Sequence, residues 1–382
     1  MVVSNFKAAS EVVYLSLDLG RALWVYGSWS PNQKEPSIHR IKTSGGSYFH
    51  TLKKLDRLIR RLRENHGKDV KLHLCYEASF IGYWLARWFR ARGVEVYVIA
   101  PNSIERPRKS RIAKTDRLDA RDLVRKLKQY LESDRRAFSV VYQPSIAEVE
   151  IRIRQRERET LLIDIHRVSG RLKATVEDQG LSVAKQRCAA GWRSVIDMLP
   201  QQNCYDGTPV SPTVISRMAR QVEQLALLES QYEQVEKEIA DYHRSLPEDS
   251  SAVKLQKFKG IGICSAQQLC AELMNWFRFS NRKQIGKYIG LTSTPNESCG
   301  RGHGLGIGKD GNSQLRRVAI QLAWLWRKYQ PDCALVRKYQ ERLDQKGRVR
   351  RIAIVALARE LMTAFWRYIV HGVEMEGVVT KK

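Results

Sequence analysis

Between residues 12 and 130, short apolar runs typical of strands alternate with segments that have a helical period. The strand-like runs end in turn or breaker residues and occupy 12–20, 22–29, 71–79 and 94–101. Helical periods cover 47–65 and 81–93. Alternation of this kind favours an α/β domain with a mostly parallel sheet. The tight connection near residue 21 predicts a hairpin, and therefore an antiparallel edge to that sheet.

The chain changes character between residues 145 and 245. Residues 145–178 contain no proline and no strand-like run, and their apolar residues recur at helical spacing. A second run has the three-and-four spacing of a coiled-coil seam, at Leu225, Leu228, Tyr232, Val235, Ile239 and Tyr242. The turn-rich segment 201–212 separates the two runs. We expect a helical hairpin or antiparallel coiled-coil arm that self-associates. Two core helices of a bundle are the alternative that the periodicity leaves open.

The last third has glycine-rich turns among helical segments. A GIG turn at 260–262 lies between two helical patterns, which a helix-hairpin-helix element would need. An ordinary structural turn is the alternative. Seven glycines fall within 290–312, and we expect a loop there. It lacks the strand–GxxxxGK[ST]–helix context of a nucleotide-binding P-loop. Helical pattern returns at 314–329 and 349–368, and the tail after 373 is expected to fray.

The charge balance favours a polyanionic partner. Lys and Arg number 66 against 40 Asp and Glu, which gives a net charge of +26. An excess of this size is typical of nucleic-acid-binding proteins, although ribosomal and membrane-surface proteins share it. Seven scattered cysteines without a CxxC pair argue against a zinc site or a disulfide scaffold. No signal peptide and no membrane span are recognisable, so we expect a cytoplasmic protein without a membrane partner.

Four carboxylates are candidates for a metal site. Asp18 and Glu77 each end a strand-like run, and parallel strands place such ends on one edge of a sheet. Asp116 and Asp119 are three residues apart at the start of a helical stretch, so they project from one face. Such a cluster repels itself unless divalent cations neutralise it, and two Mg²⁺ ions would suit phosphoryl transfer. Basic neighbours would then contact phosphates: Arg111, Lys114, Arg117 and Arg121.

Each acid also has an ordinary structural interpretation. Asp116 and Asp119 fit a helix cap and its first-turn partner. Asp18 precedes Gly20 and suits a turn, while Glu77 suits a solvated strand end. Asp122 continues the three-residue spacing and is an alternative member of the set. The residues alone leave these alternatives open.

Several strings resemble the IS110/IS1111 family of transposases, relatives of the Piv DNA invertase. The resemblance covers about 12–372, and its N-terminal half includes YEAS at 76–79 and AKTDRLDAR at 113–121. Its C-terminal half includes KGIGICSA at 259–266, PNESCG at 295–300 and RVRRIAIVALARELMTAFWRYIVHGV at 348–373. Two matched halves in the family's order make chance similarity improbable.

The resemblance implies a RuvC/RNase H-like domain whose four acidic metal ligands fall on Asp18, Glu77, Asp116 and Asp119. It implies Mg²⁺ or Mn²⁺ as cofactor. It also implies a nucleophilic serine at Ser298, although Cys299 stands where the family usually has glycine. By the same resemblance, target and donor DNA are selected by a structured non-coding bridge RNA. The resemblance also implies a composite site built between protomers, and from the heptad run at 225–242 we expect a homodimer that assembles into a tetramer.

The expected fold class is α/β plus α, in four segments. These are a RuvC-like domain at 1–140, a coiled-coil arm at 141–248, a mostly helical C-terminal transposase domain at 249–373 and a tail at 374–382. Further candidate nucleic-acid contacts in the C-terminal domain are Arg301, Lys309, Arg316 and Arg317. Three hypotheses remain: a bridge-RNA-guided DNA recombinase, a metal-dependent RuvC-like nuclease or Holliday-junction resolvase without serine chemistry, and a non-catalytic binding protein.

Overall fold

A computed structural model describes residues 11–43, 48–104, 116–298, 301–308 and 311–381. The chain divides into two compact units, Met1–Pro144 and Ser145–Lys382. The finer division of the sequence into a catalytic domain, an arm and a C-terminal domain stays a prediction.

The first unit is built on a five-stranded sheet in the order β3-β2-β1-β4-β5. Its strands are β1 (Val12–Leu19), β2 (Leu23–Trp29), β3 (Ser37–Lys42), β4 (Lys71–Glu77) and β5 (Val94–Ile99). The three strands β1, β4 and β5 run parallel, whereas β2 and β3 form an antiparallel edge. The expected antiparallel edge is present, but strand β3 was not predicted, and with it two of the four strand pairings are antiparallel. The apolar residues of β3 are Ile38 and Ile41, three residues apart, so this edge strand lacks the period-two alternation that marks a half-buried strand.

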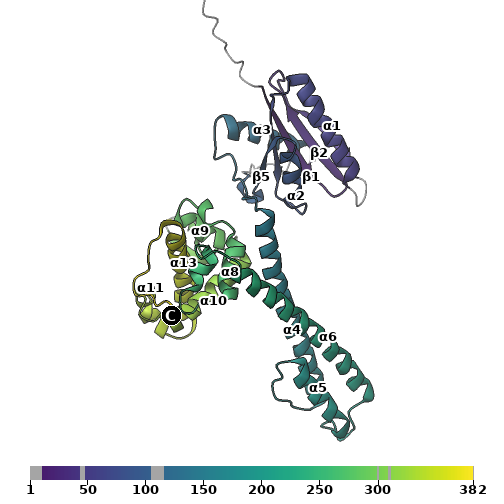
Figure 1. The fold of residues 1–382 in the computed structure, drawn as a ribbon, viewed down its shortest axis with the longest axis vertical. Helices are drawn as coiled ribbons and strands as arrows, with labels where there is room; N and C mark the ends of the chain where they lie inside the picture. The colour runs from purple at the N-terminus through teal and green to yellow at the C-terminus, as the bar shows by residue number, and fades with distance from the viewer. Residues whose placement is uncertain (1–10, 44–47, 105–115, 299–300, 309–310, 382) are drawn as a thin grey trace, which may run out of the picture. The chain divides into compact units, whose positions relative to one another are not determined.

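Helices cover both faces of this sheet. Alternate side chains of a strand point to opposite faces, so Val13, Leu15 and Leu17 pack with α1 (Phe49–His66) and α2 (Trp84–Arg90). The intervening Tyr14 packs with α3 (Asp116–Glu132) on the other face. Figure 1 shows α1 and α3 on opposite sides of the strands. The expected α/β architecture of this part is confirmed.

Two 33-residue helices begin the second unit, α4 (Ile146–Asp178) and α6 (Pro212–Arg244). A capping box at Ser145 starts α4. The two helices pack antiparallel, because the later part of α4 meets the early part of α6 and the reverse. A third helix that the sequence analysis missed, α5 (Ala189–Met198), buries Trp192 against both. The end of the α4–α6 pair that contains the later part of α4 is therefore a cluster of three helices.

The remaining helices enclose one large apolar core around Trp326 and Phe365. Among the residues that the structure describes, no helix is both long enough and apolar enough to cross a membrane. The elements are α7 (Ser251–Gln256), α8 (Ile263–Leu273), α9 (Arg282–Ile289), α10 (Ser313–Tyr329), α11 (Ala334–Arg337), α12 (Gln340–Asp344) and α13 (Gly347–His371), with 3₁₀ turns at Pro101–Ser103, Leu199–Gln201 and Trp276–Arg278.

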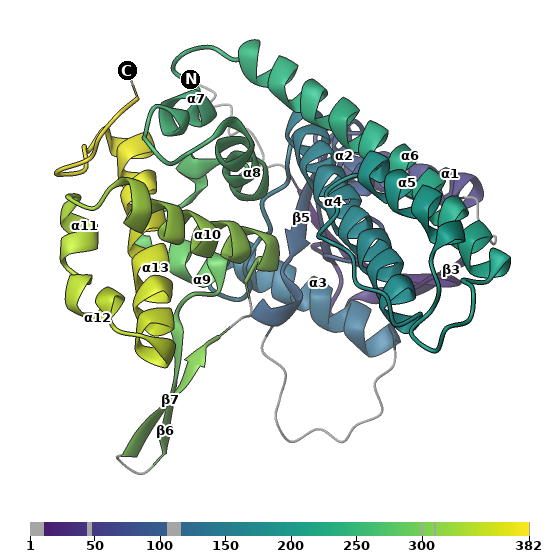
Figure 2. The ribbon, with the colours of Figure 1, turned by 90° about the horizontal axis from the view of Figure 1, so that it is seen from below.

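The glycine-rich segment is a β-hairpin and not the loop expected from its composition. Strand β6 (Ser293–Ser298) pairs antiparallel with β7 (Arg301–Ile307), and Ser298 is opposite Arg301. In Figure 2 the hairpin extends away from the helices of its unit. Alternate glycines lower the strand propensity of β7, so the pairing with β6 is what makes this segment a strand.

The C-terminal tail is tied to the helical core, so the expectation of a frayed tail is wrong. The side chain of Gln330, fully buried at the end of α10, donates to the carbonyls of Lys259 and Val379 and accepts from the Val379 amide. The amide of Lys381 donates to the carbonyl of Lys257. These hydrogen bonds satisfy backbone groups that a frayed tail would expose to water.

Candidate active site

Asp18 and Glu77 lie side by side at the carboxyl ends of two parallel strands. The register of β1 and β4 pairs Ser16 with Cys75 and Leu17 with Tyr76. The next step along both strands brings Asp18 opposite Glu77. Neighbouring strands are about 4.8 Å apart, so the backbones of the two acids are close. Both side chains are half-buried.

Both acids point to the face of the sheet that α3 covers. The Ser16 hydroxyl donates to the Ala120 carbonyl across 2.6 Å, and the Cys75 thiol donates to the Leu123 carbonyl across 3.4 Å. Asp18 follows Ser16 by two residues, and Glu77 follows Cys75 by two. Because the side-chain period of a strand is two, each acid shares the face of that neighbour.

The first turn of α3 lies over this edge of the sheet. Helix α3 runs opposite to β1, because Ala120 lies at Ser16 whereas Glu132 accepts a hydrogen bond from the Tyr14 hydroxyl at 2.8 Å. Asp116 begins the helix about 6 Å before Ala120, and Asp18 lies about 7 Å beyond Ser16. The helix start and the strand ends therefore reach the same level.

This backbone placement brings all four predicted acids to one edge of the sheet. The Asp119 side chain is half-buried, while that of Asp116 is outside the described residues. Among the side chains that are described, no three His, Cys, Asp or Glu form a group that could hold a metal ion. The chemistry of the donor set, four carboxylates from two strand ends and one helical turn, nevertheless suits a hard divalent cation.

Two residues beside the acids were missed by the sequence analysis. Arg21 and Phe80 follow Asp18 and Glu77 by three residues each, and the Arg21 guanidinium lies 5.5 Å from the centre of the Phe80 ring. The Phe80 side chain is 56% exposed. Each of these two residues follows an acid by three positions, and this shared spacing could have been recognised in the sequence.

The basic residues predicted near Asp116 are described only in part. The positions of Arg111 and Lys114 and the side chain of Arg117 are outside the described residues. Arg121 is half-buried, and its Nε has no hydrogen-bond partner among the residues that the structure covers. A phosphate-binding role for these four residues stays a prediction.

The predicted nucleophile, Ser298, is the last residue of β6. The backbone of Arg301 begins β7 opposite it. The side chains of both residues are outside the described part of the chain, as is Lys309. The hairpin therefore presents Ser298 at the end of its strand farthest from the helical core.

A buried carboxylate anchors the base of this hairpin. Glu272, 1% exposed on α8, accepts two hydrogen bonds from Arg156 of α4 at 2.8 and 3.0 Å, and one from the Asn312 side chain at 2.7 Å. Burial would raise the pKa of Glu272, but the hydrogen bonds from Arg156 and Asn312 outweigh it and hold the pKa below its ordinary value. The same Asn312 caps α10 through the amides of Gln314 and Leu315.

The chain re-enters the helical core through a close backbone contact at Gly311. A Cβ on this glycine would lie 2.3 Å from the Tyr288 carbonyl oxygen. The next amide, that of Asn312, donates to this carbonyl at 2.8 Å, and the Gly308 amide donates to the Thr292 carbonyl at 2.9 Å. Only glycine permits this approach, which explains the Gly-Asn pair that follows the hairpin.

Two further predicted nucleic-acid contacts have protein partners. Arg316 donates to the Ile289 carbonyl at 3.3 Å, at the end of α9. Arg317 donates to the Gln314 side chain at 2.5 Å and forms an ion pair with Glu159. Both arginines therefore have a structural role, and their contact with nucleic acid stays a prediction.

Comparison with known proteins places the chain among transposases. Residues 38–179 match a transposase family model that carries the DEDD name, and residues 252–338 match the Transposase IS116/IS110/IS902 family. A putative transposase, y4rJ, of Sinorhizobium fredii is 32% identical over 97% of this chain and 94% of its own length. The transposase for insertion sequence element IS1111A of Coxiella burnetii is 24% identical over 68% of this chain and 65% of its own length.

These similarities define the protein class, a DNA transposase of an insertion sequence. The chain belongs to the IS110 family, because the y4rJ similarity spans nearly all of both chains. Its substrate is therefore DNA. Membership of the DEDD group also indicates a general dependence on a divalent metal.

Proposed function

We propose that this transposase cuts and rejoins DNA strands through a covalent bond to Ser298, with the four-carboxylate edge of the sheet as its metal site. The carrying observation is the parallel register that sets Asp18 beside Glu77 beneath the first turn of α3. A structural turn and a solvated strand end would not require both acids to face the same helix.

Asp18, Glu77, Asp116 and Asp119 would hold Mg²⁺ or Mn²⁺. When bound, such an ion polarises a phosphoryl oxygen and stabilises the charge that develops on it. The protein's own contribution is geometric, because two paired strands and a packed helix hold the carboxylates where a phosphate can approach. Basic side chains near Asp116 would position that phosphate.

The Ser298 hydroxyl oxygen attacks the phosphorus of one DNA phosphodiester. A serine oxygen–phosphorus bond forms as one backbone oxygen–phosphorus bond breaks, and the hydroxyl proton ends on the released DNA oxygen. The phosphate remains a diester throughout, so a DNA hydroxyl can reverse the step without an external energy source. A serine hydroxyl is a weak nucleophile at neutral pH, so it needs activation by a metal or a base.

The architecture supports further parts of the proposal. The strand order β3-β2-β1-β4-β5 supports a RuvC/RNase H-like first unit. The antiparallel α4 and α6 helices support an arm for self-association, in a homodimer that pairs into a tetramer. In that assembly, Ser298 of one subunit completes the acidic site of another. The net charge of +26 supports binding of a structured bridge RNA as well as target and donor DNA. We place the protein in the cytoplasm, at the nucleoid.

A suicide DNA substrate tests the serine step. With Mg²⁺ present, wild-type protein should retain labelled DNA through denaturing electrophoresis, and the adduct should map by peptide mass to the segment around Ser298. Ser298→Ala should abolish the adduct, because it removes the attacking oxygen and changes no charge. The matched control is Ser293→Ala at the other end of β6, and Cys299→Ala removes the adjacent thiol. Free cleaved DNA without any adduct would favour the nuclease hypothesis.

A further inference from the structure

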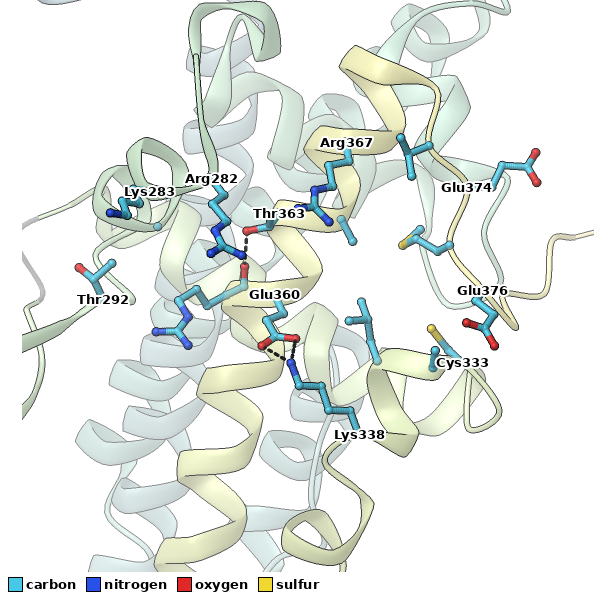
Figure 3. Close-up of a pocket in the computed structure, with 17 residues that line it drawn as sticks. Arg282, Lys283, Thr292, Cys333, Lys338, Glu360, Thr363, Arg367, Glu374 and Glu376 are labelled. Atoms are coloured by element: carbon cyan, nitrogen blue, oxygen red, sulfur yellow. Dashed lines mark hydrogen bonds and ion pairs between the residues drawn. The ribbon is translucent and has the colours of Figure 1, made fainter.

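A groove of about 640 Å³ lies between α9, α13 and the C-terminal segment of the second unit. Its cationic wall contains Arg282 and Lys283 of α9 and Arg359 and Arg367 of α13. In Figure 3, Arg282 and Arg367 lie on the side opposite Glu374 and Glu376. The groove therefore has separate positive and negative sides.

The cations of this wall are available to a ligand. None of these four side chains has a hydrogen bond or ion pair with any residue that the structure describes. The fifth cation, Lys338, is already neutralised, because its ammonium group contacts both oxygens of Glu360 at 2.8 and 2.9 Å. Three of the four unpaired side chains are exposed, and the fourth, Arg359, is half-buried. An anion placed here would meet the positive charge of Arg282, Lys283 and Arg367, while Arg359 also interacts electrostatically with Glu360.

The spacing of the arginines suits a phosphate backbone. Arg359, Thr363 and Arg367 are four residues apart on α13, so they form one stripe along the helix. The Thr363 hydroxyl donates its hydrogen to the Arg359 carbonyl at 3.1 Å. Outward hydrogen bonds from this stripe are therefore made by the guanidinium groups of Arg359 and Arg367. The aliphatic stem of Arg359 lies against Gly286. A Cβ added to Gly286 would be 3.9 Å from the Cδ of Arg359. Guanidinium groups hold phosphates through paired hydrogen bonds.

The groove is continuous with the strand that carries Ser298. Thr292 lines it and immediately precedes β6. From Thr292 to Ser298 the strand spans about 20 Å, at roughly 3.3 Å per residue. That length equals about six base pairs of duplex DNA at 3.4 Å each.

We propose that this groove binds the phosphate backbone of the DNA substrate about six base pairs from the phosphate that Ser298 attacks. The offset rests on the proposed function of Ser298, whereas the binding itself does not. Glu374 and Glu376 would repel the same backbone and so confine it to the arginine wall. The groove thus positions the DNA and takes no part in the chemical step.

Salt-dependent binding of a duplex to the full-length protein tests the groove. The variant Arg282→Gln/Arg359→Gln/Arg367→Gln is compared with Arg342→Gln/Arg348→Gln/Arg351→Gln, which removes three exposed arginines of α12 and α13 outside the groove. Both triple variants have the same net charge. Affinity is measured by anisotropy in EDTA, so that no cleavage intervenes.

The groove variant should lower the slope of log K against log salt by about 0.9 for each lost phosphate contact, about 2.7 in all. The control should change it by less than about 1. Equal losses in the two variants would overturn the proposal, because they would reflect net charge alone. Arg367→Gln alone, at an exposed position, tests the groove if the triple variant is unstable. Glu374→Gln/Glu376→Gln should tighten DNA binding.

Two further measurements distinguish failure of the groove proposal from failure of the proposed role of Ser298. If the groove variant loses affinity for a structured RNA but keeps its affinity for DNA, the assignment to DNA is wrong. Methylphosphonate substitution of each phosphate in turn should weaken wild-type binding about six base pairs from the cleaved position, and the groove variant should lack this interference. Interference elsewhere, with the slope effect intact, would refute the offset and therefore the link to Ser298, but not the groove.

Discussion

At the scale of single residues, the position of the acids depends on strand parity. Asp18 and Glu77 face α3 because each lies two residues beyond a side chain that is hydrogen-bonded to that helix, Ser16 and Cys75. A slip of one residue would turn the acids into the opposite core, where Leu17 and Tyr76 are buried. Register is therefore strongly specified at this edge.

Asp18→Asn and Glu77→Gln should each lower DNA cleavage by roughly 100-fold or more, because each removes a charge from the proposed ligand set. Neither change alters side-chain volume, so the thermal midpoint should stay close to that of wild type. Asp122→Asn is the control, because Asp122 lies three residues beyond Asp119 on α3 and outside the proposed ligand set. If Asp122→Asn inactivates the protein while Asp116→Asn and Asp119→Asn leave it active, the assignment of α3 residues is wrong.

Glu272 should make the second unit sensitive to acid. Its folded pKa lies below the ordinary value of 4.5, so its contribution is complete above that pH and is lost as pH falls through the folded pKa. The unfolding midpoint of wild type should therefore fall more steeply below about pH 4.5 than that of Glu272→Gln. Glu341→Gln, at an exposed position on α12, should show the same loss of stability at acid pH as wild type. Parallel curves for wild type and Glu272→Gln would contradict this account.

At the scale of elements, the α4–α6 pair shows what a heptad pattern can and cannot specify. The pattern at 225–242 correctly predicts a helix with one apolar face. Leu225 is fully buried there, but among residues of α5 as well as α4. The helix α5 has too few residues for a strong periodic signal, and it acquires its place by burying Trp192.

Leu225→Ala should destabilise the second unit by about 2–5 kcal/mol, because it leaves a cavity among α4, α5 and α6. Leu227→Ala removes the same atoms from a side chain that is 59% exposed, and it should change stability by less than about 0.5 kcal/mol. Chemical denaturation followed by circular dichroism measures both. Equal effects would mean that the helix faces are assigned wrongly.

At the scale of the whole molecule, the acidic edge and Ser298 belong to separate compact units. Under the proposed trans arrangement, Ser298→Ala and Asp116→Asn subunits should each be inactive alone. Mixed assemblies should regain part of the cleavage, because some then contain one site with both halves intact. Native mass spectrometry confirms that mixed assemblies form. No recovery in their presence would locate the whole site within one subunit.

The net charge of +26 predicts strong and salt-sensitive binding of nucleic acid. If a bridge RNA guides the reaction, the transcript that flanks the gene should bind more tightly than a scrambled RNA of equal length at physiological salt. Competition binding at several salt concentrations measures the difference. Equal affinity for both RNAs would remove RNA guidance from the proposal and leave the DNA chemistry untouched.

Local sequence determined the elements with strong periodicity and the residue types available for chemistry. The strands that contain Asp18 and Glu77, the long helices α4 and α6, and the acids of the α3 turn follow from hydrophobic spacing and from a family resemblance. These features depend on neighbours within a few residues, so short-range pattern is sufficient for them. The edge strand β3, the short helix α5 and the tied tail lacked such a pattern.

Only the tertiary structure decided which of these groups meet. Parallel pairing of β1 with β4 joins acids 59 residues apart, and pairing of β6 with β7 turns a glycine-rich segment into a hairpin. The arginine groove unites α9 with α13, whose cations are unremarkable in sequence. Long-range contacts of this kind arise because apolar faces must be buried together, and the polar groups they bring into register are recognisable only once that packing is known.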